Sequence, residues 1–130
     1  MGKRVFVLDD EPDVIDLLRT ILEGEGFEVE TATEGHSALV RLLDAPPDLL
    51  LLDLMMPHLD GFELLKLIRQ DPKGALIPVL IVSARTGHSD QIQSLQLGAD
   101  AYICKPFSPR DLLQQVKALT GESEEGDSIE

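Results

Sequence analysis

The chain has 130 residues, of which 43% are hydrophobic, so it is long enough to bury the core of one globular domain. Its 24 acidic and 11 basic residues give a formal net charge of -13, which argues against direct binding of nucleic acid or of an anionic membrane surface. Cys104 is the single cysteine, which excludes an internal disulfide, and neither a signal peptide nor a membrane-spanning apolar run is visible, so a cytoplasmic location is expected.

The first apolar run of the chain, residues 4–8, predicts a strand, and the acidic pair Asp9 and Asp10 follows it directly. Apolar residues at helical spacing between positions 14 and 22 then predict a helix with one buried stripe. A second strand is expected at 27–31, followed by a second helix around 38–43 that stops before two prolines.

Four successive leucines mark the third predicted strand, at 48–53, which ends at Asp53. So short and fully apolar a run is typical of a strand that is buried on both faces of a sheet. A carboxylate at the exit of such a strand is partly removed from water, so its ionised form needs a partner. The next helix is expected to begin at Asp60 and to end at Asp71.

The last two predicted strands also end beside polar side chains. The fourth, at 78–82, is followed by Ser83 and then by a helix at about 89–97. The fifth, at 101–104, is followed by Lys105, and the final helix begins a few residues later. Every strand after the second is thus followed by a side chain that can ionise or donate a hydrogen bond.

The strict alternation of strands and helices predicts an α/β domain, built as a doubly wound parallel sheet with helices on both faces. We assign residues 1–120 to this single domain. Residues 121–130 contain five acidic residues and no basic one, so they are expected to form a disordered acidic tail or a truncated linker.

Acidic side chains follow the first and third predicted strands, and in a parallel sheet these strand ends meet at one edge. Asp9, Asp10 and Asp53 should therefore converge there, together with Ser83 and Lys105. Close carboxylates repel each other, so either one of them binds a proton or a cation lies among them. A hard divalent cation with oxygen ligands, such as Mg²⁺, suits these donors, and a phosphoryl group would suit Ser83 and Lys105.

In order and spacing, these segments resemble the receiver domain of two-component response regulators over about residues 3–119. The matching segments are Val7-Leu8-Asp9-Asp10-Glu11, Leu52-Asp53-Leu54-Met55-Met56-Pro57, Leu59-Asp60-Gly61, Val82-Ser83-Ala84, Leu97-Gly98-Ala99-Asp100-Ala101-Tyr102 and Lys105-Pro106-Phe107. The resemblance implies the flavodoxin-like (βα)5 fold, a five-stranded parallel sheet in the order 2-1-3-4-5 with helices on both faces.

The resemblance also implies a role for each matching residue. Asp53 corresponds to the phosphoacceptor, whose carboxylate takes a phosphoryl group from a kinase histidine. The implied cofactor is Mg²⁺, with Mn²⁺ as an alternative. Its ligands would be Asp10, Asp53 and the backbone carbonyl of Met55, with Asp9 assisting through water.

Lys105 corresponds to the lysine that pairs with the phosphoryl oxygens, and its peptide bond to Pro106 is expected to be cis. Ser83 and Ala84 belong to the phosphoryl-binding and switch segment, in which the Ser83 hydroxyl moves towards the phosphoryl group. Tyr102 corresponds to the aromatic residue that rotates inward with it.

A receiver of this kind would be a signalling domain rather than an enzyme, assisting only its own phosphorylation and dephosphorylation. Its implied partners are a sensor histidine kinase or a histidine phosphotransfer protein, and a downstream protein target. The family places the target surface on the fourth helix, the fifth strand and the fifth helix. The chain is expected to be a monomer or a phosphorylation-dependent dimer, without direct contact to nucleic acid or membrane.

Three other functions share parts of this pattern. A phosphate-independent adaptor would use the same fold as a docking surface, although the complete set of acids and Lys105 count against it. Phosphohydrolases of the haloacid dehalogenase type commonly carry Asp-x-Asp after the first strand, whereas this chain has Asp9-Asp10-Glu11. A flavodoxin-like electron carrier would need a Ser/Thr-rich phosphate loop after the first strand and a Trp to stack on the flavin, and the sequence has neither.

Overall fold

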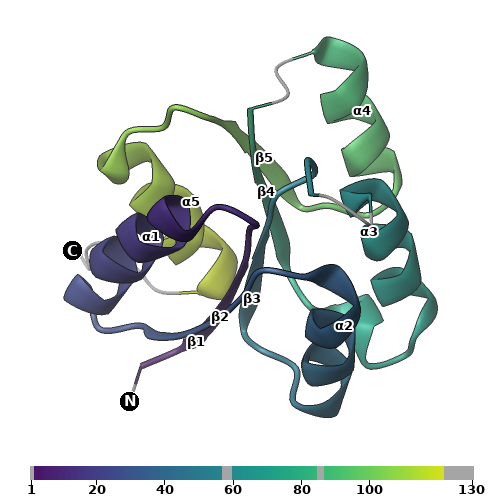
Figure 1. Cartoon of the computed structure of the whole chain (residues 1–130), viewed down its shortest axis with the longest axis horizontal. Coiled ribbons are helices and arrows are strands. Elements are labelled where there is room, and N and C mark those ends of the chain that lie inside the picture. The colour runs from purple at the N-terminus through teal and green to yellow at the C-terminus, as the bar shows by residue number, and fades with distance from the viewer. Residues whose placement is uncertain (1, 57–59, 85–86, 122–130) are drawn as a thin grey trace.

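The computed structural model describes residues 2–56, 60–84 and 87–121, in which five strands alternate with five α-helices (Figure 1). The strands are β1 (Arg4–Leu8), β2 (Glu28–Ala32), β3 (Leu49–Leu52), β4 (Val79–Ser83) and β5 (Ala101–Cys104). The helices are α1 (Pro12–Gly24), α2 (Gly35–Asp44), α3 (Gly61–Gln70), α4 (His88–Gln96) and α5 (Pro109–Thr120), and a short 3-10 turn, η1 (Gly74–Leu76), follows α3.

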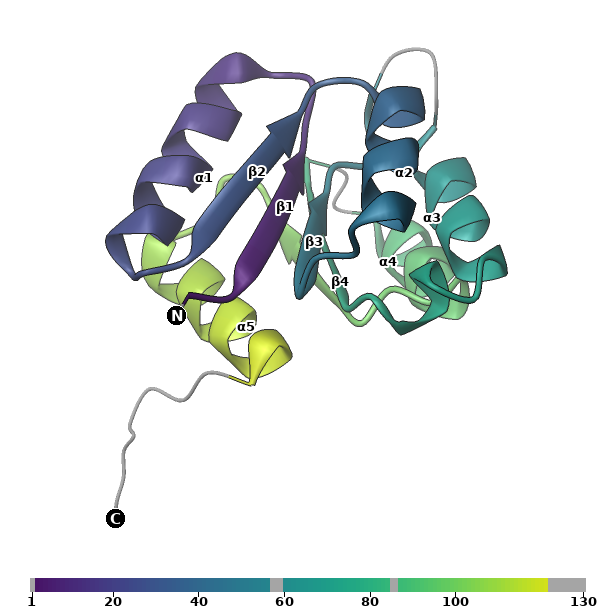
Figure 2. The ribbon, with the colours of Figure 1, turned by 90° about the horizontal axis from the view of Figure 1, so that it is seen from below.

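The strands form one parallel sheet in the order β2-β1-β3-β4-β5. Because all five strands run in the same direction, their carboxyl ends lie along one edge of the sheet, as the arrowheads of β1 and β2 show in Figure 2. This arrangement confirms the predicted doubly wound α/β fold and its strand order. The strand order reverses between β1 and β3, which is where such sheets place their ligand sites.

Helices cover both faces of the sheet, α1 and α5 on one and α2, α3 and α4 on the other (Figure 1). The side chains of β3 alternate between the two resulting cores. Leu49 and Leu51 pack with α1 and α5, whereas Leu50 and Leu52 pack with α2 and α3. All four are at most 1% exposed, so the four-leucine run is buried on both faces as its composition indicates.

Local capping fixes where several helices begin. Asp60 accepts a hydrogen bond from the N–H of Phe62 at 2.9 Å, and Ser108 accepts one from the N–H of Asp111 at 3.0 Å. Glu34 caps α2, although glutamate is not among the residues that usually do so. Its carboxylate accepts hydrogen bonds from the N–H of Ser37 and from that of His36, and these bonds lower its pKa to about 2.

Replacing Glu34 with alanine should lower the melting temperature near neutral pH, because two N–H groups at the start of α2 lose their acceptor. The pKa of Glu34 falls from 4.5 to about 2 on folding, so its contribution to stability is complete above pH 4.5 and is lost as the pH falls towards 2. Thermal melts of both proteins across this range provide the measurement. An equal deficit at both ends of the range would contradict the assignment of this cap.

The observed bounds of β1 and β5 match the predicted ones, and those of the other three strands differ by one residue. β2 and β4 begin and end one residue later than expected, and β3 is one residue shorter at each end. Asp53 therefore lies just beyond β3, where its N–H donates to the carbonyl of Leu8 at 3.0 Å. Ser83 is the last residue of β4 rather than the first residue after it. The acidic tail predicted at 121–130 lies, apart from Gly121, outside the described residues.

No helix among the described residues combines the length and the apolar character that are needed to span a bilayer.

Candidate functional site at the carboxyl edge of the sheet

The carboxyl ends of β1 and β3 bring three aspartates together. Oxygen atoms of Asp9, Asp10 and Asp53 all lie within 4.8 Å of one another. Asp9 is 2% exposed and Asp53 is 4% exposed, whereas Asp10 is half-buried. The sequence predicted this convergence, because both strands end at the same edge and the acids follow them directly.

Backbone N–H groups fix the orientation of the two buried carboxylates. The N–H of Glu11 donates to Oδ1 of Asp9 at 2.9 Å, and the N–H of Met55 donates to Oδ1 of Asp53 at 3.0 Å. Each aspartate thus accepts a hydrogen bond from the residue two positions later, a local turn typical of Asp. The second oxygen of each carboxylate is left to face the site.

Lys105, which follows β5, places its ammonium group between these oxygens. Its Nζ lies 2.8 Å from Oδ2 of Asp9 and 3.3 Å from Oδ2 of Asp53. The side chain of Lys105 is 14% exposed, so these ion pairs are largely shielded from water and screened only weakly by salt. A cation therefore does lie among the carboxylates, and in this structure the lysine supplies it.

Asp9 and Lys105 form the closest ion pair of the site, and on each of them burial and the charge of the partner shift the pKa in opposite directions. Burial raises the pKa of the Asp9 carboxyl above its usual value of 3.8, although its hydrogen bonds with Lys105 and Glu11 oppose that rise. Burial acts to lower the pKa of Lys105, but the hydrogen bond to Asp9 and the charge of Asp53 raise it above 10.5. The lysine accordingly remains a cation at neutral pH and compensates the buried carboxylates.

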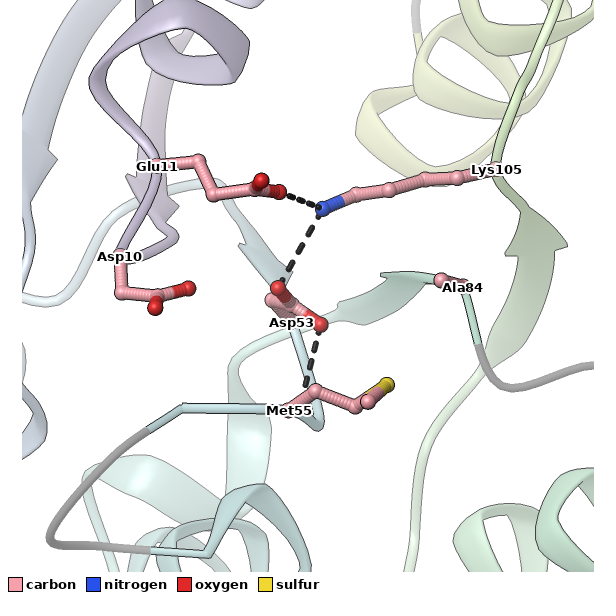
Figure 3. A pocket seen from close by; sticks show the side chains of 6 residues that line it. All are labelled: Asp10, Glu11, Asp53, Met55, Ala84 and Lys105. Carbon is pink, nitrogen blue, oxygen red and sulfur yellow. Dashed lines mark hydrogen bonds and ion pairs between the residues drawn. The ribbon is translucent and has the colours of Figure 1, made fainter.

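The acidic cluster opens into a cavity of about 280 Å³. Six residues line it, namely Asp10, Glu11, Asp53, Met55, Ala84 and Lys105 (Figure 3). Asp53 and Lys105 both line this cavity and lie 3.3 Å apart, so a small anionic group bound in the cavity would lie close to both side chains. The Lys105–Pro106 peptide bond, where the chain leaves the cavity, is cis.

Gly61 lets α3 begin directly beneath the Asp53 loop. A Cβ atom at this position would lie 2.5 Å from Cα of Leu54 and 2.9 Å from the carbonyl oxygen of Asp53. Both neighbours are backbone atoms, so neither has the freedom to rotate away. The N–H of Gly61 also donates to the carbonyl of Leu54 at 3.2 Å, which ties the helix start to the segment that holds Asp53.

Four predicted site residues do not line the cavity, namely Asp9, Ser83, Tyr102 and Pro106. Asp9 reaches the site through its contacts with Asp53 and Lys105, and Pro106 follows Lys105 across the cis peptide bond. Ser83 is fully buried at the end of β4, and the adjacent Ala84 is exposed and forms part of the cavity wall. Tyr102 is partly buried and packs against the core that lies beneath α2 and α3. The structure thus brings together the three aspartates, Met55, Ala84 and Lys105, whereas Ser83 and Tyr102 do not line the cavity.

The donors at this edge fit a hard divalent cation. They comprise three carboxylate groups with oxygens close enough to share one ion, and oxygen is the ligand that Mg²⁺ prefers. The thiol of Cys104, the single cysteine of the chain, instead accepts a hydrogen bond from Gln91 at 3.7 Å. The donor set therefore fits an oxygen-ligated divalent cation beside the ammonium group of Lys105.

Glu11 also belongs to the site, although no role was predicted for its side chain. Its carboxylate Oε1 lies 3.4 Å from Lys105 Nζ (Figure 3). The motif Asp9-Asp10-Glu11 was visible in the sequence, but a third acid in such a run is equally compatible with the start of a helix. Only the folded position of Lys105 shows that Glu11 reaches the site.

Comparison with known proteins gives matches over nearly the whole chain. The sequence model of the response regulator receiver domain matches residues 5–117. The alkaline phosphatase synthesis transcriptional regulatory protein PhoP of Bacillus subtilis is 42% identical over 124 residues, and the phosphate regulon transcriptional regulatory protein PhoB of Rhizobium meliloti is 42% identical over 119 residues. These alignments cover 95% and 92% of this chain but 51% and 52% of the relatives, so the chain spans about half the length of these curated relatives.

The backbone of the chain also resembles that of a solved receiver domain structure. A CheY-like response regulator receiver domain protein from Methanospirillum hungatei superposes with a TM-score of 0.85 at 34% sequence identity. The superposition covers 93% of this chain and 95% of that protein.

Proposed function

The chain belongs to the response regulator receiver domain family, and from that premise we propose that it is a phosphorylation-driven switch in a two-component phosphorelay. In this proposal Asp53 accepts a phosphoryl group from a phosphohistidine, and the added negative charge changes a surface used for protein contacts. The observation that carries the proposal is the setting of Asp53, a buried carboxylate that lines an acidic cavity and contacts Lys105.

Asp53 would act as the nucleophile. Its carboxylate is already oriented by the N–H of Met55 on one oxygen and by Lys105 on the other, so little motion is needed when a donor arrives. A carboxylate oxygen forms a bond to phosphorus while the bond from phosphorus to the donor nitrogen breaks, and that nitrogen keeps the electron pair. Lys105 would offset the negative charge on the transferred phosphoryl oxygens.

The proposed cofactor is Mg²⁺, with Mn²⁺ as an alternative. Asp9, Asp10 and Asp53 would hold it, with the backbone carbonyl of Met55 as a further ligand. When bound, the cation supplies positive charge for the phosphoryl oxygens. The closeness of the three carboxylates supports this assignment, because their mutual repulsion favours the binding of a divalent cation between them.

Ser83 and Tyr102 would convert the new charge into a change of surface. We propose that the Ser83 hydroxyl moves towards the phosphoryl group bound beside Ala84, and that Tyr102 turns inward as it does so. The readout would involve α4, β5 and α5. Within the described chain, Ser94 is the only fully buried residue of α4, so this helix is held by few core contacts and can shift at low cost.

The proposed partners are a sensor histidine kinase or histidine phosphotransfer protein as the donor and a downstream protein as the target. An apolar hollow of about 390 Å³ adjoins the acidic cavity and shares Lys105 and Ala84 with it. Its apolar lining, which includes Leu17 and Phe107, would suit the helix that presents a phosphohistidine.

The two named relatives are transcriptional regulatory proteins, and the expectation of no direct contact with nucleic acid concerns the receiver domain alone.

The proposal is tested by incubating the protein with acetyl phosphate and Mg²⁺ and measuring its intact mass. We expect one added phosphoryl group on the wild-type chain, none on the Asp53→Asn variant, and none when Mg²⁺ is removed with a chelator. Asp44→Asn is the matched control, because Asp44 is an exposed aspartate at the end of α2, away from the carboxyl edge of the sheet. That variant should be labelled as fast as the wild type.

Labelling of Asp53→Asn at the wild-type rate would show that another residue is the acceptor. If the wild-type chain were not labelled and did not bind Mg²⁺ at millimolar concentration, the phosphate-independent adaptor would become the better assignment. Repeated turnover of phosphate esters would point instead to a phosphohydrolase. The first of these outcomes concerns the acceptor residue, and the other two concern the class of protein.

A further inference from the structure

Glu11 presents a third carboxylate to the ammonium group of Lys105. Its Oε1 lies 3.4 Å from Nζ, compared with 2.8 Å for Oδ2 of Asp9 and 3.3 Å for Oδ2 of Asp53. Figure 3 shows Glu11 and Asp53 approaching the end of the Lys105 side chain from different directions. The side chain of Glu11 is 61% exposed, whereas those of Asp9 and Asp53 are buried.

An ammonium group has three N–H donors, and these three carboxylates can engage all of them. A phosphoryl oxygen can therefore bind Lys105 only after one carboxylate has released it. Asp9 makes the shortest contact and is buried, so releasing it would leave a charge without a partner out of water. Asp53 is the proposed nucleophile and must stay in place.

Glu11 is the carboxylate that can leave at the lowest cost. Its contact is the longest of the three, and its carboxylate is readily hydrated when it turns away into solvent. Its backbone is held independently of its side chain, because its N–H donates to Asp9 while its carbonyl accepts from Val14 and Ile15 at the start of α1. A change of side chain therefore leaves the loop in position.

We propose that Glu11 competes with the incoming phosphoryl group for Lys105 and thereby restrains the phosphorylation of Asp53. Glu11 is a positioning residue in this inference, acting through Lys105 rather than on the phosphorus atom. The inference rests on the proposed function and concerns the rate of the same transfer. Its consequence is that a resting receiver discriminates against small phosphodonors that have no protein contacts to help displace Glu11.

The test measures the rate at which acetyl phosphate labels the wild-type chain and the Glu11→Gln and Glu11→Asp variants in the presence of Mg²⁺. In this reaction the Asp53 oxygen binds phosphorus as the bond from phosphorus to the acetate oxygen breaks, and acetate leaves with the electron pair. Glu11→Gln should be labelled about three to ten times faster, as expected for the loss of one exposed charge contact. A merely structural role would not produce such a gain.

The Glu11→Asp variant separates competition for Lys105 from simple repulsion of the donor. It keeps the negative charge, but a side chain shorter by one methylene no longer reaches Nζ, so it should also be labelled faster than the wild type. Labelling of Glu11→Asp at the wild-type rate would overturn the competition. Asp13→Asn is the matched control, because it removes one exposed charge from the first turn of α1, and its rate should stay within about twofold of the wild type.

The outcomes distinguish this inference from the proposed function. If the wild-type chain is labelled on Asp53 but Glu11→Gln is equally fast or slower, the inference fails and the function stands. If Asp53 of the wild-type chain is not labelled, the proposed function fails instead.

Discussion

Replacing Lys105 with methionine should lower the free energy of unfolding by about 2 to 4 kcal/mol near neutral pH, because two buried carboxylates lose their cationic partner. Asp9 and Asp53 are at most 4% exposed and lie 2.8 Å and 3.3 Å from Lys105 Nζ. Methionine retains much of the aliphatic stem of lysine, so the change removes the charge while disturbing the packing little. Chemical denaturation followed by circular dichroism provides the measurement.

Two further measurements connect this deficit to the electrostatics of the site. The pKa of Asp9 already lies above 3.8 because of burial, and losing Lys105 should raise it further. The stability difference between the wild type and Lys105→Met should therefore shrink as the pH falls from neutral towards the pKa of Asp9, since protonation of Asp9 removes its uncompensated charge. Mg²⁺ should stabilise the variant more than the wild type, because it supplies the missing positive charge.

Lys66→Met is the matched control for this experiment. Lys66 pairs with Glu63 at 3.7 Å on the surface of α3, where the two side chains are 52% and 59% exposed. Such a pair contributes little, so the control should stay within about 0.5 kcal/mol of the wild type. A Lys105→Met variant as stable as this control would mean that the buried carboxylates do not depend on the lysine.

Replacing Arg69 with methionine in the otherwise wild-type chain is also expected to lower the free energy of unfolding by about 2 to 4 kcal/mol. Arg69 is 18% exposed and donates to the carbonyl oxygen of Gly98 through Nε at 3.0 Å and through Nη2 at 2.7 Å. Its Nη1 donates to the carbonyl of Gly74 at 2.7 Å. One side chain thereby joins the end of α3 to η1 and to the turn after α4.

The effect of removing Arg69 should be local as well as global. Gly98 has a φ of +108° and a Cβ there would lie 2.8 Å from Nε of Arg69, so the turn and the guanidinium group fit each other closely. Asp100 pairs with Arg69 at 3.3 Å and accepts a hydrogen bond from the N–H of Val79 at 2.8 Å. Amide hydrogen exchange should therefore accelerate at the carboxyl end of α4 and at the start of β4.

Two variants control for charge and for general loss of an arginine. Arg69→Lys keeps the charge but cannot reproduce the fork of donors, so it should recover less than half of the lost stability. Arg19→Met removes an arginine that is 40% exposed and bonded to Glu23 and Thr31, and should cost less than about 1 kcal/mol. If Arg69→Lys were as stable as the wild type, the paired guanidinium donors of Arg69 would not be what holds the turn at Gly98.

Local patterns in the amino-acid sequence were sufficient to predict the fold and the residues that lie at the carboxyl edge of the sheet. Short apolar runs alternating with helical stripes require parallel strands, and parallel strands bring Asp9, Asp10, Asp53 and Lys105 to one edge whatever the details of packing. Even the alternate burial of the four β3 leucines follows from their being apolar on both faces. These features depend on spacing along the chain, which a sequence shows directly.

The contacts between charged side chains could not be predicted without the packed structure. Lys105 meets Asp9, Asp53 and Glu11 across more than 50 residues of chain, and Arg69 reaches Gly98 29 residues away. The capping role of Glu34 was likewise missed, because glutamate is an uncommon cap and its neighbours give no signal. Such contacts depend on how far a flexible side chain reaches once distant segments are packed, and local spacing carries no information about that distance.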